Sequence, residues 1–209
     1  GPEIGVAATK TLSSQLVGLN LLIAHLVGER RQPDLVDALR SVPSDVQAVL
    51  DESTAAADGE TVADAEAFFF IGRGLDYPVA LEGALKFKEV TYEHAEGFAA
   101  GELKHGPLAL VTPETPVFAV VTGGGEAARK AGGNVKEVEA RDAPVVVVTD
   151  GTAEAPRYAD HVLEVPATRD RLAPLLANVQ LQLVAYHVAN ELGRSIDKPR
   201  NLAKSVTVE

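Results

Sequence analysis

The sequence of 209 residues contains no cysteine, no methionine and no tryptophan. Without cysteine the chain has no disulfides, no thiolate zinc site and no cysteine nucleophile, and nothing indicates an oxidising compartment. We therefore expect a cytoplasmic protein. Because a natural chain begins with methionine and this one begins with Gly1, we also expect a fragment or a processed product.

Long hydrophobic runs are lacking as well. The longest apolar stretch, residues 16–28, is interrupted by Asn20 and His25 and is shorter than the ~20 residues that span a bilayer. No basic segment followed by a small-residue cleavage site opens the chain, which predicts no secretory signal. We expect no membrane partner.

Basic residues are the minority, with 19 lysines and arginines against 30 acidic residues and a net charge of −11. This balance disfavours nucleic acid and anionic membrane surfaces as partners. No group of histidine, aspartate and glutamate residues has the spacing of a metal site, so we expect neither a metal nor a cofactor.

The first third of the chain has helical patterns and no strand signal. Residues 5–27 carry apolar side chains on nearly every face, which predicts a helix that is buried on most sides. Pro33 opens a second helical pattern over residues 33–52, and Pro43 predicts an interruption or a kink in it. These segments form a helical lead-in to the rest of the chain.

From residue 67, strand candidates alternate with helical segments. The strand candidates are AFFFIG, VFAVVTGGG, PVVVVTDG and HVLEVP, and the helical segments are residues 76–96, 126–141 and 171–193. This alternation predicts an α/β fold, a doubly wound layer in which helices cover both faces of a parallel sheet. The last helix is expected to end at Gly193, and an irregular tail follows it.

A charged stripe marks the helical segment 76–96. Glu82, Lys86, Glu89 and Glu93 recur at spacings that place them on one helix face. One interpretation is a solvated face with a surface ion pair. The other is a site, because Lys86 between two glutamates can keep Glu89 ionised and able to take a proton next to a carbonyl or imine.

Two further segments leave alternatives open. In AGELKHGPLAL, His105 is either a general acid or base or part of an ordinary helix stop before Gly-Pro. The tail is by default a disordered end, and the alternative is that the apolar neighbours of Lys204 favour a neutral amine and hence imine chemistry. The TGGG segment at residues 122–125 lacks the rest of a phosphate-binding motif and is interpreted as a flexible loop.

Four segments together resemble the isomerase half of the glucosamine-6-phosphate synthases, the glutamine:fructose-6-phosphate amidotransferases. They are GPEIGVAATK, GRGLDYPVALEGALKFKEVTYEHAEGFAAGELKHGPLAL, LQLVAYHVA and KPRNLAKSVTVE, and the resemblance runs from Gly1 to Glu209. The family's isomerase region has two sugar isomerase (SIS) subdomains, each with a five-stranded parallel sheet between helices. The resemblance implies that residues 1–60 are the end of the first subdomain with connecting helices, 61–193 the second subdomain, and 194–209 an active-site tail.

The resemblance also implies roles for particular residues. Lys204 would form a Schiff base with C2 of fructose 6-phosphate, and Glu89 would move a proton between C1 and C2 with support from Lys86. His105 would assist ring opening from the neighbouring subunit of a homodimer. The residues implied to line the sugar site are Glu3 and the backbone of Val6 and Ala203.

The same resemblance implies an enzyme that converts fructose 6-phosphate to glucosamine 6-phosphate with nitrogen from a glutaminase domain. The family's phosphate loop and glutaminase domain have no counterpart in this chain, and Ala8 stands where the family commonly has serine. We therefore expect the isolated fragment to be inactive or incomplete. The alternatives are a non-catalytic sugar-phosphate-binding regulatory SIS module and a dimerisation scaffold.

Overall fold

A five-stranded parallel sheet forms the centre of the computed structural model, which describes residues 2–28 and 33–205. Its strand order is β2-β1-β3-β4-β5, with every neighbouring pair parallel. The strands are β1 (Ala67–Gly72), β2 (His94–Ala99), β3 (Val117–Val121), β4 (Val145–Thr149) and β5 (His161–Glu164). From β1 the sheet is extended on one side by β2 and on the other by β3. In this class of fold, the loops that leave two such neighbouring strands in opposite directions form a crevice for a ligand.

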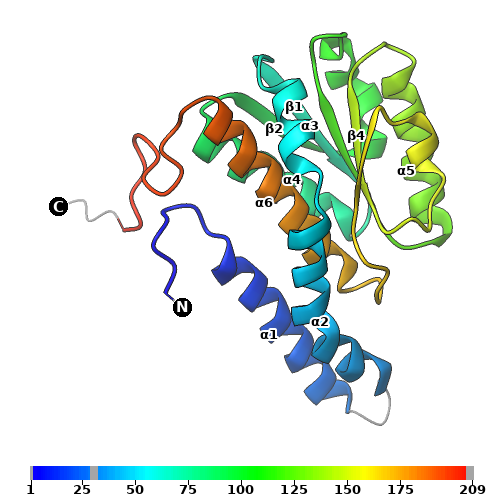
Figure 1. Ribbon diagram of the computed structural model, residues 1–209. Helices are drawn as coiled ribbons and strands as arrows, with labels where there is room; N and C mark the ends of the chain where they lie inside the picture. The colour runs from blue at the N-terminus through cyan, green and yellow to red at the C-terminus, as the bar shows by residue number, and fades with distance from the viewer. Residues whose placement is uncertain (1, 29–32, 206–209) are drawn as a thin grey trace.

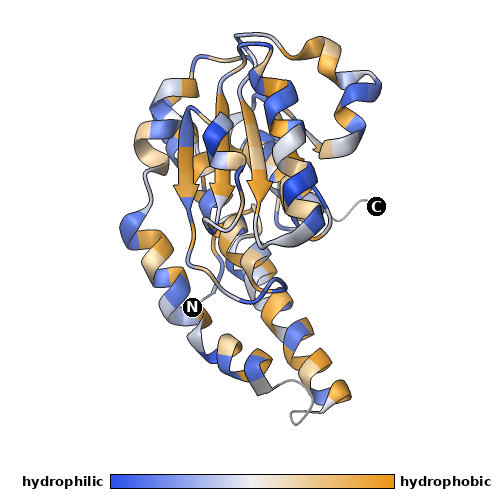
Figure 2. Ribbon diagram, turned by 90° about the vertical axis from the view of Figure 1, so that its right-hand side faces the viewer, coloured by the Kyte–Doolittle hydropathy of each residue, from blue (hydrophilic) through white to orange (hydrophobic). Residues whose placement is uncertain are grey.

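The strands are apolar on both faces because both faces are covered. Phe68, Phe70 and Phe118 point into one buried core, whereas Phe69 and Ile71 point into the other. Successive strand residues alternate between the two cores, as the period of two requires. Figure 2 shows these strands as the most hydrophobic part of the molecule.

Helices α3 (Ala55–Val62), α4 (Asp76–Thr91) and α6 (Ala173–Glu191) cover the face that carries Phe68 and Phe70. Helix α5 (Gly125–Glu139) covers the opposite face together with the short 3₁₀ helices η2 (Ala100–His105) and η4 (Ala155–Tyr158). A third 3₁₀ helix, η3 (Pro107–Leu110), follows η2. The predicted doubly wound α/β layer is thus confirmed, and the five-stranded sheet that the resemblance implied is present.

Helices α1 (Lys10–Val27) and α2 (Pro33–Glu52) project from this body side by side (Figure 1). The prediction of a helix from residue 5 that is buried on most sides is wrong. The helix begins at Lys10, and of its residues only Asn20 and Ala24 are buried. The reason is that α1 packs through one side only, and its other leucines face outward. Helix α2 continues through Pro43 without the predicted interruption.

The segment predicted as one helix over residues 76–96 is a helix followed by a strand. Helix α4 ends at Thr91, its C-cap Tyr92 has a left-handed backbone with φ 71°, and β2 begins at His94. The predicted end of α6 is confirmed. Gly193 has φ 63°, and the N–H groups of Gly193 and Arg194 donate to the carbonyls of Asn190 and Ala189, a Schellman arrangement.

None of the helices in the described part of the chain is long and apolar enough to cross a membrane.

Candidate functional site

The two ends of the described chain meet at an ion pair. Lys204 Nζ donates to Glu3 Oε2 at 3.0 Å and to the Gly5 carbonyl at 3.0 Å. The Lys204 side chain is half exposed, whereas only 6% of the Glu3 side chain is exposed. The N-terminal segment therefore holds the amine at the edge of the molecule while keeping one side of it open to solvent.

The start of α1 fixes the Glu3 carboxylate. Its Oε1 accepts from the Thr9 N–H at 2.8 Å and the Thr9 hydroxyl at 3.0 Å, and its Oε2 accepts from the Thr11 hydroxyl at 2.6 Å. The Thr11 hydroxyl, the Thr9 N–H and Lys204 together hold the pKa of Glu3 well below its usual range, against the opposing effect of burial. Glu3 is thus held in its ionised form beside the Lys204 amine.

The charged stripe on α4 forms a second ionic cluster. Lys86, which is 5% exposed, bonds to Glu89 Oε2 and lies 3.5 Å from Glu82 Oε1. Burial raises the pKa of Glu82, and Lys86 only partly opposes this effect. Since Lys86 is buried and paired with two carboxylates, the stripe is not a solvated helix face.

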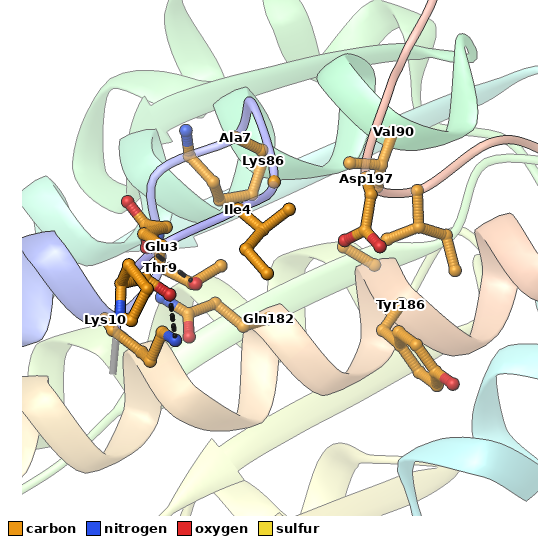
Figure 3. A pocket seen from close by; sticks show the side chains of 14 residues that line it. Glu3, Ile4, Ala7, Thr9, Lys10, Lys86, Val90, Gln182, Tyr186 and Asp197 are labelled. Atoms are coloured by element: carbon orange, nitrogen blue, oxygen red, sulfur yellow. Dashed lines mark hydrogen bonds between the residues drawn. The ribbon is translucent and has the colours of Figure 1, made fainter. Parts of the chain in front are cut away.

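A pocket of about 350 Å³ lies between the N-terminal segment, α4, α6 and the start of the tail. In Figure 3, Glu3, Thr9 and Lys10 gather at one end, and Tyr186 and Asp197 lie at the other. Of the residues that the sequence predicts for the site, Glu3 and Lys86 line this pocket, and each binds another predicted residue, Lys204 and Glu89 respectively. Lys204 and Glu89 do not themselves line the pocket but are bonded to residues that do.

The other predicted residues lie elsewhere. His105 is exposed at the end of η2, and neither Val6, Ala203 nor His105 is among the residues that line the pocket. The Val6 N–H donates to the Asp197 carbonyl at 3.0 Å, which ties the N-terminal segment to the tail. Within one copy of the chain, His105 is separate from the two ionic clusters.

A buried aspartate closes the carboxyl edge of the sheet near β1 and β3. Asp76, which is 6% exposed, accepts from the Thr122 N–H at 2.9 Å and the Thr122 hydroxyl at 2.6 Å. Asp150 Oδ2 accepts from the Gly123 N–H at 2.9 Å. Burial raises the pKa of Asp76 to about 6, with the charges of Asp150 and Asp170 adding to the effect and the Thr122 bonds opposing it. The first N–H groups of the TGGG segment thus already bind carboxylates of this chain.

Sequence reasoning missed the residues that support the site. The sequence gives no periodic signal for Thr9 and Thr11, because they reach Glu3 only where the chain turns into α1. Gln182 is a further lining residue, and its Nε2 is buried without a hydrogen-bond partner among the described residues. In the sequence, only the position of Gln182 on a strongly apolar helix distinguishes it as a candidate site residue.

Comparison with known proteins identifies the class to which this fold and pocket belong. The model of the SIS domain family matches residues 61–192, so the chain belongs to the SIS domain family. Its predicted second subdomain, residues 61–193, is nearly the same segment.

Individual members of this family show a more specific similarity. The chain is 54% identical to the glutamine–fructose-6-phosphate aminotransferases [isomerizing] of Methanosarcina acetivorans and Halobacterium salinarum over its whole length. It spans 35% of the length of each of these curated relatives. It is also similar to the C-terminal domain of the glucosamine-fructose-6-phosphate aminotransferase of Francisella tularensis, with 36% identity and a TM-score of 0.79 over 95% of this chain and 58% of that one. The chain is thus homologous to the isomerase part of these enzymes, as the sequence resemblance predicts.

Proposed function

We propose that this chain is part of the isomerase module of a glutamine–fructose-6-phosphate aminotransferase, which converts fructose 6-phosphate to glucosamine 6-phosphate. The observation that carries the proposal is the pairing of Lys204 with Glu3 and of Lys86 with Glu89, because Glu3 and Lys86 line the same pocket. An amine and a carboxylate base beside one cavity are two of the groups that imine-assisted isomerisation of a ketose requires. The similarity to aminotransferases of that name supports the same assignment.

Lys204 is the proposed imine-forming residue. Its neutral amine adds to C2 of the open-chain ketose, and loss of water gives the Schiff base. Because Lys204 is bonded to Glu3 and to the Gly5 carbonyl, it must leave these partners before it attacks. The half-exposed position of its side chain leaves room for that movement.

Glu89 is the proposed proton carrier. In the ionised form it removes a proton from C1 of the sugar and, as the neutral acid, delivers it to C2, and the neighbouring Lys86 holds the carboxylate in place before the first step. Glu82 binds the same lysine from the previous turn of α4. Lys86 and Glu82, on the same helix, thus hold the Glu89 carboxylate in a fixed direction.

His105 is proposed to assist ring opening from a second copy of the chain. It is exposed on η2, outside the pocket of its own copy, which is consistent with a role across a subunit boundary. The proposed assembly is therefore a homodimer with a shared site. Nitrogen would come from a glutaminase domain in the whole protein.

Borohydride trapping tests the imine. Reduction of the whole protein in the presence of fructose 6-phosphate should add the mass of one reduced sugar to Lys204. Lys204→Arg should abolish this label and lower the activity at least a hundredfold, which corresponds to the ~3 kcal/mol expected for loss of a covalent catalyst. Lys198→Arg, an exposed lysine of the same tail, is the matched control and should retain the label. A label on another lysine, or full activity of Lys204→Arg, contradicts the assignment.

The same experiment separates the enzyme from a regulatory module. A non-catalytic sugar-phosphate-binding protein would bind fructose 6-phosphate without a borohydride label and without exchange of the C1 proton with solvent. Binding with neither signal in the whole protein would therefore replace the catalytic proposal with the regulatory one.

A further inference from the structure

Tyr92 joins the end of α4 to the C-terminal tail. The Arg200 guanidinium lies 4.4 Å from the centroid of the Tyr92 ring, and that of Arg194 lies 5.3 Å from it. Both distances are within the range in which a cation is attracted to an aromatic face. The Arg200 N–H also donates to the Tyr92 hydroxyl at 3.0 Å. One side chain thus makes three contacts to a segment more than a hundred residues away.

The residues on either side of Tyr92 reinforce this contact. Arg194 Nε donates to the Thr91 carbonyl at 3.1 Å, and its Nη2 donates to Glu93 Oε1 at 3.2 Å. Residues 91–93 together therefore hold two arginines of the tail. Both bonds have the charged guanidinium as donor, and hydrogen bonds from charged groups are stronger than those between neutral groups.

The backbone of Tyr92 is itself unusual. It has φ 71° and ψ 8°, a left-handed conformation that bulky residues rarely adopt. Such a conformation persists only where the surrounding structure holds it, and it is concentrated at functional sites. Here it turns the Tyr92 ring out of the helix line and towards the two arginines.

The segment that Tyr92 holds leads directly to Lys204. Arg200 precedes Lys204 by four residues, and Asp197 between the two arginines binds the Val6 N–H of the N-terminal segment. On the other side, Tyr92 follows Glu89 by three residues, just beyond the end of the same helix. Tyr92 therefore connects the end of the helix that carries the proposed base to the tail that carries the proposed amine.

We infer that Tyr92 is a positioning residue, which fixes the C-terminal tail to α4 and so sets where Lys204 stands relative to Glu89. The catalytic part of this inference rests on the proposed function. The structural part, that Tyr92 holds the tail, depends only on the contacts described above.

Trypsin cleavage after Arg200 tests the structural part in the whole protein, because the protease must take the Arg200 side chain away from the ring. Tyr92→Leu should accelerate this cleavage about tenfold, since two cation–π contacts and one hydrogen bond are lost. Tyr92→Phe keeps the ring and should stay within about threefold of the wild type. Tyr158→Leu is the matched control, because Tyr158 also has a cation, Lys136, over its ring but does not touch the tail.

The cleavage pattern decides the outcome. Acceleration confined to the tail in Tyr92→Leu, with Tyr158→Leu unchanged there, supports the inference. Unchanged cleavage in Tyr92→Leu overturns it. Equal acceleration after Arg129 or Lys136, on the far side of the sheet, also overturns it, because the substitution would then loosen the whole domain.

Borohydride trapping at saturating fructose 6-phosphate tests the catalytic part. Tyr92→Leu should lower the rate of label incorporation on Lys204 about tenfold and change the half-saturating sugar concentration less than twofold, and Tyr92→Phe should restore most of the rate. A wild-type rate in Tyr92→Leu, or a loss that appears only in the half-saturating concentration, overturns the positioning role. If the wild type gives no label on Lys204, the proposed function fails together with this catalytic part, and the proteolysis still decides whether Tyr92 holds the tail.

Discussion

Asp76 is a carboxylate placed where ionisation is unfavourable. It is buried at the first residue of α4, and its pKa rises from 3.8 to about 6. Because the pKa of Asp76 is higher in the native state than in the unfolded state, the native state binds the proton more tightly. The contribution of Asp76 to stability is therefore present below about pH 4 and is lost as the pH rises through about 6. The step from 3.8 to about 6 corresponds to about 3 kcal/mol.

Asp76→Asn therefore has a defined pH signature. Relative to the wild type, the variant should gain about 3 kcal/mol in free energy of unfolding between pH 4 and pH 7, because asparagine does not titrate. Urea unfolding at pH 4, 5, 6 and 7 measures the difference. Asp64→Asn, at an exposed position, is the control and should run parallel to the wild type. A parallel profile for Asp76→Asn as well would contradict the role of burial.

Among the site residues, those close in sequence were predictable and those joined by tertiary contacts were not. The cluster of Lys86 and Glu89 follows from helical spacing, since positions three apart share a face. The bond from Lys204 to Glu3 was not evident from spacing, because 201 residues separate the two. Only the resemblance to a known family placed both residues at one site, and neither spacing nor resemblance pointed to Tyr92.

At the scale of elements, the joint between β1 and α4 depends on a residue without a side chain. A Cβ atom at Gly72 would lie 2.3 Å from the Asp76 carbonyl oxygen and 2.9 Å from the Tyr77 nitrogen. Both atoms belong to the backbone, so neither can rotate away. The first turn of α4 can approach the end of β1 this closely only because position 72 is glycine.

Gly72→Ala should therefore destabilise the protein by about 1–3 kcal/mol, the usual cost of forcing extra atoms into a packed interior. Gly133→Ala is the matched control, because this exposed position inside α5 has nothing within 4 Å of the added Cβ. There alanine should stabilise the helix by about 0.5–1 kcal/mol. Chemical unfolding measures both changes, and a neutral Gly72→Ala would mean that β1 and α4 separate more easily than their packing indicates.

The predicted elements were those with a strong burial pattern. Strand β3 has five apolar residues and β4 has four valines before Thr149; both are buried throughout, and they were found from sequence. The first three residues of strand β2, HAEGFA, were assigned to the preceding helix and the strand was missed, because it is a partly exposed edge strand with polar residues and a glycine. Its strand conformation depends on pairing with β1 rather than on its own composition.

At the scale of the whole molecule, α1 leaves an apolar stripe exposed. Leu19, Leu22 and Leu26 recur at helical spacing, and each is more than half exposed. The sequence predicted burial for this helix because its composition is apolar, but composition does not identify what covers a surface. A contiguous apolar stripe of this kind is typical of an interaction surface.

We expect the 209-residue chain to associate through this stripe. Light scattering after size exclusion should give about twice the chain mass of 21.9 kDa, and the double variant Leu22→Gln/Leu26→Gln should shift the protein towards the monomer. Leu50→Gln, an exposed leucine of α2 outside the stripe, serves as the control. A strict monomer in the wild type would contradict both the homodimer and the proposed role of His105 across a subunit boundary.

The bond between Lys204 and Glu3 joins two residues that are synthesised at different times. The ribosome adds roughly 5–20 residues per second, so Glu3 emerges about 10–40 s before its partner is made. The sheet and helices α4 and α6 are complete in the chain by residue 191, before Lys204 is added, whereas the Glu3 carboxylate still lacks the Lys204 cation. A chain that stops before residue 204 would therefore contain the sheet and its covering helices but no amine beside Glu3.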